Sequence, residues 1–358
     1  DNIVKSFIEG TSLSCYGGGD WDDTLQPANK QYADHMVSGW TVALTYEGLT
    51  ILSRELKGVN DELATKYAAL CEAIKADYNK YIMEDNIPAG FIHFTDHGID
   101  KIIHPTDNRT NMKYRLLPFN RGIISELFTE EQKNIAIDSI NKHLKHPDGV
   151  RLMDKTVPYK GGNNTYFTRA ETASNFGREI GLQYCHAHIR YCEALAKVGH
   201  ADDLYKGLLT IHPVAIHNQV KNALPRQRNS YFSSSDGNFL TRYDAMENFN
   251  KLFTGEVGVK AGWRIYSSGP GIYLNQMISN MLGLRLNGEN FILDPVLPNC
   301  LNNLQFTYKI DKKCVIILYK QTGEEKVLIN NVNVPFTKET KAYRNGGYVI
   351  SKEYLQEN

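Results

Sequence analysis

Segments with a helical spacing of apolar residues alternate with long irregular segments through most of this 358-residue chain. The spacing predicts helices, arranged in antiparallel pairs, over the ranges 34–57, 61–82, 129–144, 172–198, 201–211, 239–253 and 271–283. The segments between some of these helices are long and rich in Gly, Asn and aromatic residues, which a plain helical scaffold does not require. We therefore predict a mainly helical toroid whose long loops gather at one end to form a single pocket.

The pattern changes near residue 290, where short runs with a period of two and a high content of Val, Ile, Phe and Tyr begin. Turn residues separate these runs, as in a small β domain. We predict a helical domain over 1–289, which is a partial catalytic domain, and a β-rich domain over 290–358.

Composition limits the classes of function. Lys plus Arg equals Asp plus Glu at 40 each, so no basic field attracts nucleic acid or an anionic membrane. No apolar run approaches the roughly 20 residues that span a bilayer. The six cysteines are scattered without a Cys-x-x-Cys pair, which favours free thiols in the cytoplasm and no metal site. The chain begins with Asp1 rather than Met, which suggests a piece of a longer protein.

The most unusual stretch is the acid loop, residues 17–23, in which three glycines precede Asp20, Trp21, Asp22 and Asp23. Three consecutive glycines favour a loop of special backbone shape. Carboxylates held close together raise one another's pKa, and a raised carboxyl pKa suits a general acid at neutral pH. A tryptophan beside them offers a flat face to a sugar ring. A calcium-type loop or a solvated turn remains the alternative.

Two further features indicate an anion site. Ser268 and Gly269 stand at the start of the last predicted helix, where N–H groups and a hydroxyl suit phosphate, although simple N-capping by Ser268 is the alternative. His186 and His188 lie two residues apart in a predicted helix, so they face different directions and cannot share one metal. A core or surface histidine is the default interpretation of each.

Two loops, 162–171 and 225–236, are dense in amides, hydroxyls, aromatic rings and arginine. Such groups recognise sugars, since amides and guanidinium groups bind hydroxyl pairs and aromatic rings stack on C–H faces. The candidate substrate-binding residues from these loops and their surroundings are Trp21, Arg169, Glu171, Gln227, Tyr231 and Trp263.

Gly-Asp-Trp-Asp-Asp at 19–23 resembles the Gly-Asp-Trp-Asn-Asp loop of the inverting phosphorylases of glycoside hydrolase family 94. The similarity extends to segments that begin at Arg115, Arg169, Tyr231 and Trp263, and it is greatest to the 1,2-β-oligoglucan phosphorylase group. The resemblance implies the C-terminal part of an (α/α)6 barrel followed by a small β domain. The first half of the barrel would then be the missing N-terminal half of the same protein.

The resemblance also implies residue roles. Asp23 matches the general acid, and Trp21 would line the donor-sugar subsite. His186 is the best match to the phosphate-binding histidine, with His188 as the alternative, and Ser268 with Gly269 stands where the family has a Thr-Gly pair that binds phosphate. Glu171 matches a sugar-contacting position loosely, and Asp22 replaces the family's commoner Asn.

These roles imply reversible phosphorolysis of β-1,2-linked glucooligosaccharides to α-glucose 1-phosphate. No cofactor is expected, only inorganic phosphate as co-substrate, and a homodimer is kept as a candidate assembly. The alternatives are the phosphorylase-like region of a cyclic β-1,2-glucan synthase, a non-catalytic sugar-binding module, and an inverting β-glucan hydrolase. The hydrolase would need Glu171 or Asp236 as its base.

Overall fold

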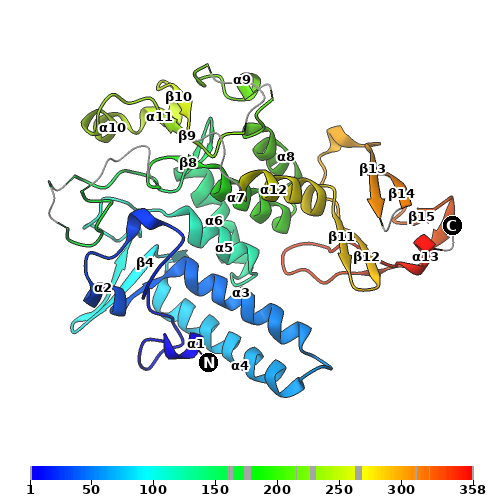
Figure 1. Cartoon of the computed structure of the whole chain (residues 1–358), viewed down its shortest axis with the longest axis horizontal. Coiled ribbons are helices and arrows are strands. Elements are labelled where there is room, and N and C mark those ends of the chain that lie inside the picture. Colours follow the sequence, from blue (N-terminus) through cyan, green and yellow to red (C-terminus); the bar gives the residue numbers. More distant parts are fainter. Residues whose placement is uncertain are drawn as a thin grey trace.

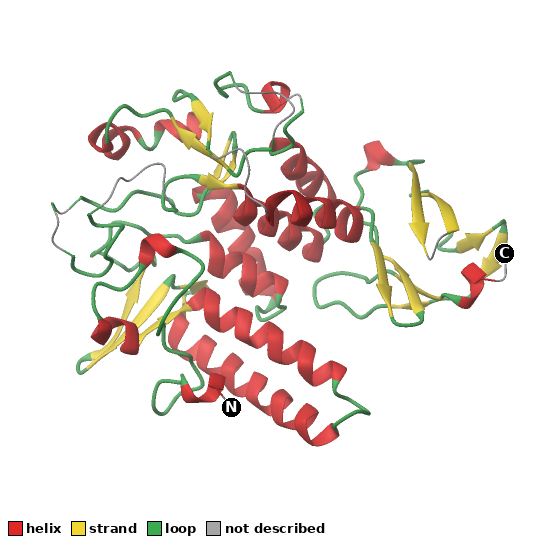
Figure 2. Cartoon of the chain, viewed as in Figure 1, coloured by secondary structure: helices red, strands yellow, loops and turns green. Residues whose placement is uncertain are grey.

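The protein is mainly helical with a β-rich C-terminal region, as predicted (Figure 2). The computed structural model describes residues 2–159, 161, 164–172, 179–214, 216–225, 231–262, 268–310, 313–321 and 323–356. In Figure 1 the C-terminal strands lie at one end of the molecule, and the segments around α2 (Lys30–His35) and β4 (Phe91–Thr95) lie at the other.

The first helix pair confirms the predicted pattern. Helices α3 (Gly39–Glu55) and α4 (Asp61–Asp77) lie side by side in Figure 1 and pack together. The side chains of Ser38 and Asn60 accept hydrogen bonds from backbone N–H groups at the two helix starts, which satisfies donors that a helix leaves unpaired there. A π-helical segment, η2 (Tyr78–Ile82), extends α4 to the predicted end.

The helix predicted from residue 34 starts later because the chain first forms β1 (Met36–Ser38). This strand pairs with β4, which in turn pairs with β5 (Gly98–Ile102), in a three-stranded antiparallel sheet. The other short elements in the first 100 residues are α1 (Asn2–Lys5), η1 (Asp23–Leu25), β2 (Met83–Glu84) and β3 (Ile87–Pro88).

Sequence periodicity missed helix α5 (Leu116–Ile124), which lies partly in the stretch 86–121 that lacks a helical pattern. Eight of its nine residues are buried, and the segment contains Pro118 and Gly122, which usually interrupt helices and so concealed this one. Pro118 is in the first turn, where backbone N–H groups have no partner within the helix. The missing N–H of proline therefore costs no helical hydrogen bond there. Gly122 is needed because a Cβ atom there would lie 2.1 Å from the ring of Phe128.

Helix α6 (Glu130–His143) begins with the predicted capping box of Thr129 and Gln132. The helix predicted over 172–198 is wrong in its first half, since α7 runs only over Cys185–Val198. Strand β8 (Gln183–Tyr184) stands directly before it and pairs with β9 (Ser234–Gly237), while residues 173–178 lie outside the described ranges. Gly199 ends α7 at a φ of 79°, as its position predicted.

The remaining helical region is built from short elements. They are β6 (Lys145–His146), β7 (Gly149–Val150), α8 (Ala201–Thr210), α9 (Ile216–Gln219), α10 (Arg242–Asn248), α11 (Lys251–Thr254), β10 (Val259–Ala261), α12 (Ser268–Asn275) and the π-helical η3 (Gln276–Met281). Strands β8, β9 and β10 form one sheet, which places the segment before α7 beside residues 234–237.

The C-terminal region begins with β11 (Leu284–Asn287) and contains a four-stranded sheet in the order β11-β12-β18-β17. Its other strands form two hairpins. The elements are β12 (Asn290–Leu293), η4 (Asn299–Leu301), β13 (Gln305–Ile310), β14 (Lys313–Leu318), β15 (Val327–Ile329), β16 (Val332–Val334), β17 (Thr337–Lys338), β18 (Tyr348–Ser351) and α13 (Glu353–Gln356).

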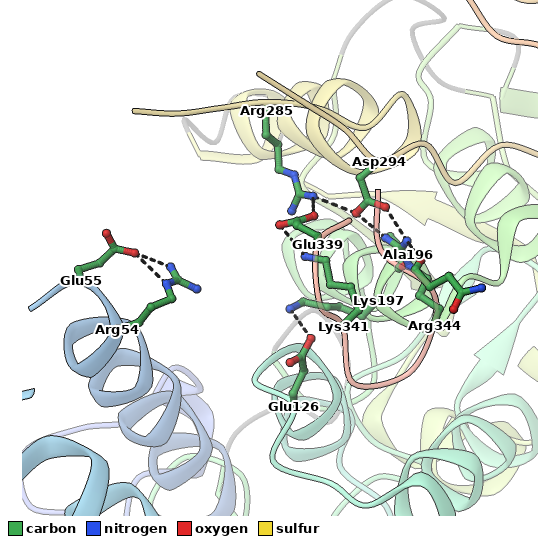
Figure 3. A network of polar contacts seen from close by, with 11 residues as sticks. Arg54, Glu55, Glu126, Ala196, Lys197, Arg285, Asp294, Glu339, Lys341 and Arg344 are labelled. Carbon is green, nitrogen blue, oxygen red and sulfur yellow. Dashed lines mark hydrogen bonds and ion pairs between the residues drawn. The ribbon is translucent and has the colours of Figure 1, made fainter. Parts of the chain in front are cut away.

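A network of charged side chains joins this region to the helices (Figure 3). Asp294 is buried and accepts hydrogen bonds from Arg344 at 2.6 and 2.7 Å and from Arg285 at 2.9 Å. Arg344 also donates from Nε to the carbonyl of Ala196, in the last turn of α7, at 3.0 Å. Tyr343 donates to the carbonyl of Phe128 at 2.7 Å. The segment 343–344 therefore fixes the C-terminal region to the last turn of α7 and to the connection between α5 and α6.

Replacing Arg344 with Ala should destabilise the protein by about 2–3 kcal/mol, because Asp294 would remain buried with half of its cationic partners. Chemical denaturation of the full chain measures this change. Arg54→Ala is the matched control, since Arg54 forms only an exposed pair with Glu55 and should cost less than about 0.5 kcal/mol. Equal effects of both substitutions would contradict the importance of the network.

Candidate active site

The acid loop ends in a short 3-10 turn, η1, that presents Asp23. Gly17 adopts a φ of 56°, a backbone conformation that glycine enters without strain. Asp22 is the N-cap of the turn, and its Oδ1 accepts a hydrogen bond from the N–H of Thr24 at 3.2 Å. Asp23 is the first residue of the turn, is exposed, and makes no hydrogen bond or ion pair with any described residue. Its carboxyl group is thus available to a ligand.

A buried ion pair holds the start of this loop. Arg115 donates from its two terminal nitrogens to the Asp20 carboxylate at 2.9 and 3.3 Å, and both side chains are 0% exposed. The same guanidinium lies 4.4 Å from the ring centre of Phe91 and contacts Ser38 Oγ and the Gly90 carbonyl. The loop is therefore anchored to the β1–β4 sheet and to the start of α5.

The three carboxyl groups of the loop lie in three different environments. Asp20 is paired with Arg115, Asp22 is completely buried, and Asp23 is exposed. Burial raises the pKa of Asp22 well above its usual value, with Asp20 and Glu179 adding to the effect and Arg115 opposing it. The elevated pKa that the sequence predicts for a carboxyl group in this loop is therefore found at Asp22.

A second loop runs beside the acid loop. Backbone N–H groups of Thr168 and Ala170 donate to the carbonyls of Gln26 and Thr24 at 2.9 and 3.0 Å. Arg169 lies between these two donors and is exposed. The two backbone hydrogen bonds therefore hold Arg169 next to the turn that carries Asp23. Thr24 Oγ1 also donates to Glu179 at 2.5 Å, which connects the turn to the segment before β8.

Glu171 holds the second loop in shape. It is 1% exposed, and its Oε2 accepts hydrogen bonds from the backbone N–H groups of Thr165, Tyr166 and Phe167, the last two at 3.0 and 3.4 Å. Asp236 is also buried and accepts from the N–H of Gly237 at 2.8 Å, with Arg151 at 3.9 Å. Both carboxylates are therefore engaged inside the protein.

Trp21 packs against the start of α7. Its ring meets Tyr184 and His186 edge to face, with centroid distances of 5.2 and 5.8 Å. This contact brings the acid loop and the predicted phosphate-binding histidine together, although they are 165 residues apart in the sequence. Tyr184 is a neighbour of the candidate site that the sequence did not single out.

The two histidines of α7 have different roles. His188 is buried, accepts a hydrogen bond at Nδ1 from the N–H of Val150 at 3.1 Å and donates from Nε2 to the Gly207 carbonyl at 2.9 Å. His186 is partly exposed and forms no hydrogen bond with a described residue. Burial lowers the pKa of His186 to about 4, with Arg190 and Arg121 contributing, so the ring is neutral at pH 7. A neutral imidazole can donate one hydrogen bond to an anion.

The start of α12 approaches the same region through Tyr231. A Cβ atom on Gly269 would lie 1.6 Å from the Tyr231 hydroxyl oxygen, so only glycine fits there. Tyr231 lies near Cys185 and Tyr184, which add to the effect of burial in raising the pKa of its hydroxyl group. Ser268 is the first residue of α12, whereas Gln227 and Trp263 lie outside the described residues. Candidate residues from four separate segments are thus brought together.

Within the described ranges, three or more His, Cys, Asp or Glu side chains are nowhere grouped so that they could bind a metal ion. Cys15, Cys71, Cys192 and Cys300 carry free thiols. Among the described helices, none has the length and apolar character needed to cross a membrane.

Comparison with known proteins agrees with this arrangement. Residues 2–232 match the family described as "Glycosyl hydrolase 94 superfamily, catalytic domain". The chain belongs to glycoside hydrolase family 94. Residues 283–358 match a "Glycoside phosphorylase C-terminal domain". A 1,2-beta-oligoglucan phosphorylase of Listeria innocua serovar 6a is 45% identical over 355 residues, which cover 99% of this chain and 32% of that protein. The chain therefore spans about a third of the length of this relative.

The sequence did not identify Arg115 as the anchor of the acid loop. A lone arginine before the apolar run Leu116-Leu117-Pro118-Phe119 is a signal of a buried charge that needs a partner. Sequence alone does not indicate which of the 40 acidic residues that partner is.

The pH dependence of stability should reveal the neutral, buried His188. Burial lowers its pKa to about 4, below the usual 6.5, so its contribution to stability is present above pH 6.5 and is lost as the pH falls towards 4. His188→Gln should therefore lower the free energy of unfolding most at pH 7 and progressively less on acidification. Denaturant titrations from pH 7.5 to 4.5 measure the difference, and a deficit that is the same at every pH would contradict the assignment.

Proposed function

We propose that this chain is the C-terminal part of an inverting glycoside phosphorylase that cleaves β-1,2-linked glucooligosaccharides with inorganic phosphate. The products would be α-glucose 1-phosphate and a shortened oligosaccharide, and the reaction would be reversible. The observation that carries the proposal is an exposed carboxyl group, Asp23, on an anchored turn whose tryptophan contacts His186. The similarity to a 1,2-beta-oligoglucan phosphorylase, at 45% identity, supports the linkage.

The proposed chemistry needs one acid and one anion site. An inverting hydrolase uses an acid to protonate the leaving oxygen and a base to activate water. Phosphate arrives already anionic, so the base can be replaced by groups that bind and orient the anion. Asp23 would protonate the glycosidic oxygen while phosphate attacks the anomeric carbon from the opposite face.

The anion site would lie where α7 and α12 begin. Both helix starts offer backbone N–H groups and a partial positive charge. His186, neutral at pH 7, would donate a hydrogen bond to phosphate, and Ser268 with Gly269 would supply a hydroxyl and a backbone N–H. The close approach of Gly269 to Tyr231 supports a compact site in which phosphate and sugar are adjacent.

The sugar would be bound mainly by Trp21, Arg169 and Tyr231, which are aromatic or cationic and stand near the acid loop in the fold. Gln227 and Trp263 stay predictions from the sequence. For Glu171 we propose a positioning role, because its carboxylate organises the backbone of loop 165–167.

The burial of Glu171 and Asp236 favours a phosphorylase over a hydrolase. An inverting hydrolase needs a carboxylate that can activate water in the pocket. Glu171 is 1% exposed and Asp236 is 6% exposed, and each accepts backbone hydrogen bonds. Neither therefore offers a solvent-facing base in this arrangement.

We further propose that the chain completes an (α/α)6 toroid together with the rest of a longer cytoplasmic protein, since it covers 32% of its relative. Inorganic phosphate would be the co-substrate, and no other cofactor is proposed. A homodimer stays a prediction.

Asp23→Asn in the full-length protein should lower the rate of phosphorolysis of β-1,2-glucooligosaccharides by at least about a thousandfold, because the proton donor is lost. The measurement is release of glucose 1-phosphate with and without phosphate, accompanied by calorimetric binding of the oligosaccharide. Asp34→Asn, which changes an exposed carboxylate on α2, is the control and should have no effect. Release of free glucose without phosphate would show a hydrolase instead.

His186→Ala should raise the KM for phosphate by about 10- to 100-fold, the effect of losing one hydrogen bond to a charged group. The KM for the oligosaccharide should change much less. His97→Ala, at an exposed histidine in the β4–β5 turn, is the matched control. An unchanged phosphate KM in His186→Ala would remove His186 from the anion site.

A further inference from the structure

Asp22 is the carboxyl group of the acid loop that serves neither as the proposed acid, Asp23, nor as the ion-pair partner of Arg115, Asp20. Its side chain is 0% exposed, although it is adjacent to the exposed Asp23. Oδ1 accepts the hydrogen bond that starts the turn, from Thr24 N–H at 3.2 Å, and the Asp22 carbonyl accepts from Leu25 N–H at 3.1 Å. The residue therefore holds both ends of the turn that presents Asp23.

The other oxygen of Asp22, Oδ2, is buried and has no hydrogen-bond partner in the described part of the chain. An ionised carboxylate would thus bury a charge with half of its acceptor capacity unsatisfied, which costs several kcal/mol in proteins. A protonated carboxyl group carries no charge and keeps Oδ1 as the acceptor for the cap. The geometry favours the neutral form.

The charged groups around Asp22 do not compensate a negative charge. Arg115 is the cation that lowers the pKa of Asp22, but it forms no hydrogen bond with Asp22. Its terminal nitrogens donate to Asp20, Ser38 and the Gly90 carbonyl. Asp20 and Glu179 are carboxylates that add repulsion, and Tyr16 is a buried phenol on the same side of the loop. Asp22 therefore has no cation of its own among the described residues.

We propose that Asp22 is a positioning residue that stays protonated in the folded protein and acts as a neutral cap for the turn that carries the catalytic acid. The expected effect of Asp22 on activity rests on the proposed function, in which Asp23 is the acid. The protonation of Asp22 is a property of the folded chain and can be tested separately. Burial also raises the pKa of Asp22 well above its usual range, which agrees with the geometry.

The neutral cap has a consequence for the reaction. A second negative charge beside Asp23 would favour the protonated form of Asp23 and would also repel phosphate. With Asp22 uncharged, replacement by the isosteric amide removes no charge and keeps the acceptor oxygen. Replacement by alanine removes the cap and frees the turn.

The decisive test compares Asp22→Asn with the wild-type protein in denaturant titrations from pH 4 to pH 7. In the wild type, the unfolded chain ionises Asp22 above pH 3.8 while the folded chain keeps it protonated. The contribution of Asp22 to stability is thus complete below pH 3.8 and is lost as the pH rises. The folding constant of the wild type should fall relative to that of Asp22→Asn by about tenfold per pH unit above pH 4. A constant ratio, or a ratio that changes in the opposite direction, would overturn the proposal.

Kinetics of the full-length protein provide the second readout. Asp22→Asn should keep kcat/KM within about threefold and leave the alkaline limb of its pH profile in place, whereas Asp22→Ala should lose at least about tenfold. A shift of the alkaline limb to lower pH in Asp22→Asn would show that Asp22 is ionised, and would also overturn the proposal. If phosphorolysis is absent in the wild type, the proposed function fails while the stability test of Asp22 still stands.

Discussion

The buried pair of Asp20 and Arg115 is the contact on which the candidate site depends. Neither side chain is exposed, and the pair joins a glycine-rich loop to the start of a buried helix 95 residues later. Buried ion pairs add little net stability, because desolvation of the charges offsets their attraction. Breaking one is nevertheless costly, since a single unpaired charge would remain in the interior. The pair therefore determines where the loop sits more than how stable the fold is.

The sequence predicted those elements whose cause is local. The capping box at Thr129, the glycine stop at Gly199 and the amphipathic helices α3 and α4 each depend on neighbouring residues. Helix α5 was missed because Pro118 and Gly122 usually interrupt helices, and only the packing of Gly122 against Phe128 shows why glycine stands there. The start of α7 was misplaced because strand pairing with residues 234–235 interrupts a helical pattern, and such pairing is a long-range effect.

The candidate site divides in the same way. Spacing alone indicated that His186 and His188 face different directions, but only the positions of Val150 and Gly207 determine which ring is engaged. The mutual influence of the three aspartates was predictable from their closeness. The assignment of the raised pKa to Asp22 was not predictable from the sequence. It follows from the burial of Asp22 and from the pairing of Arg115 with Asp20 rather than with Asp22. Sequence motifs thus nominated the candidate residues, and tertiary contacts distinguish the buried ones from the exposed ones.

Helix α7 connects the two parts of the molecule mechanically. Its first turn carries His186 against Trp21, and its last turn offers the carbonyl of Ala196 to Arg344 of the C-terminal region. A helix of 14 residues extends over about 21 Å and behaves as a rigid rod at this length. Anchoring one end therefore restricts the position of the other. The network of Asp294, Arg285 and Arg344 therefore anchors the C-terminal β region to one end of the helix that carries His186 near its other end.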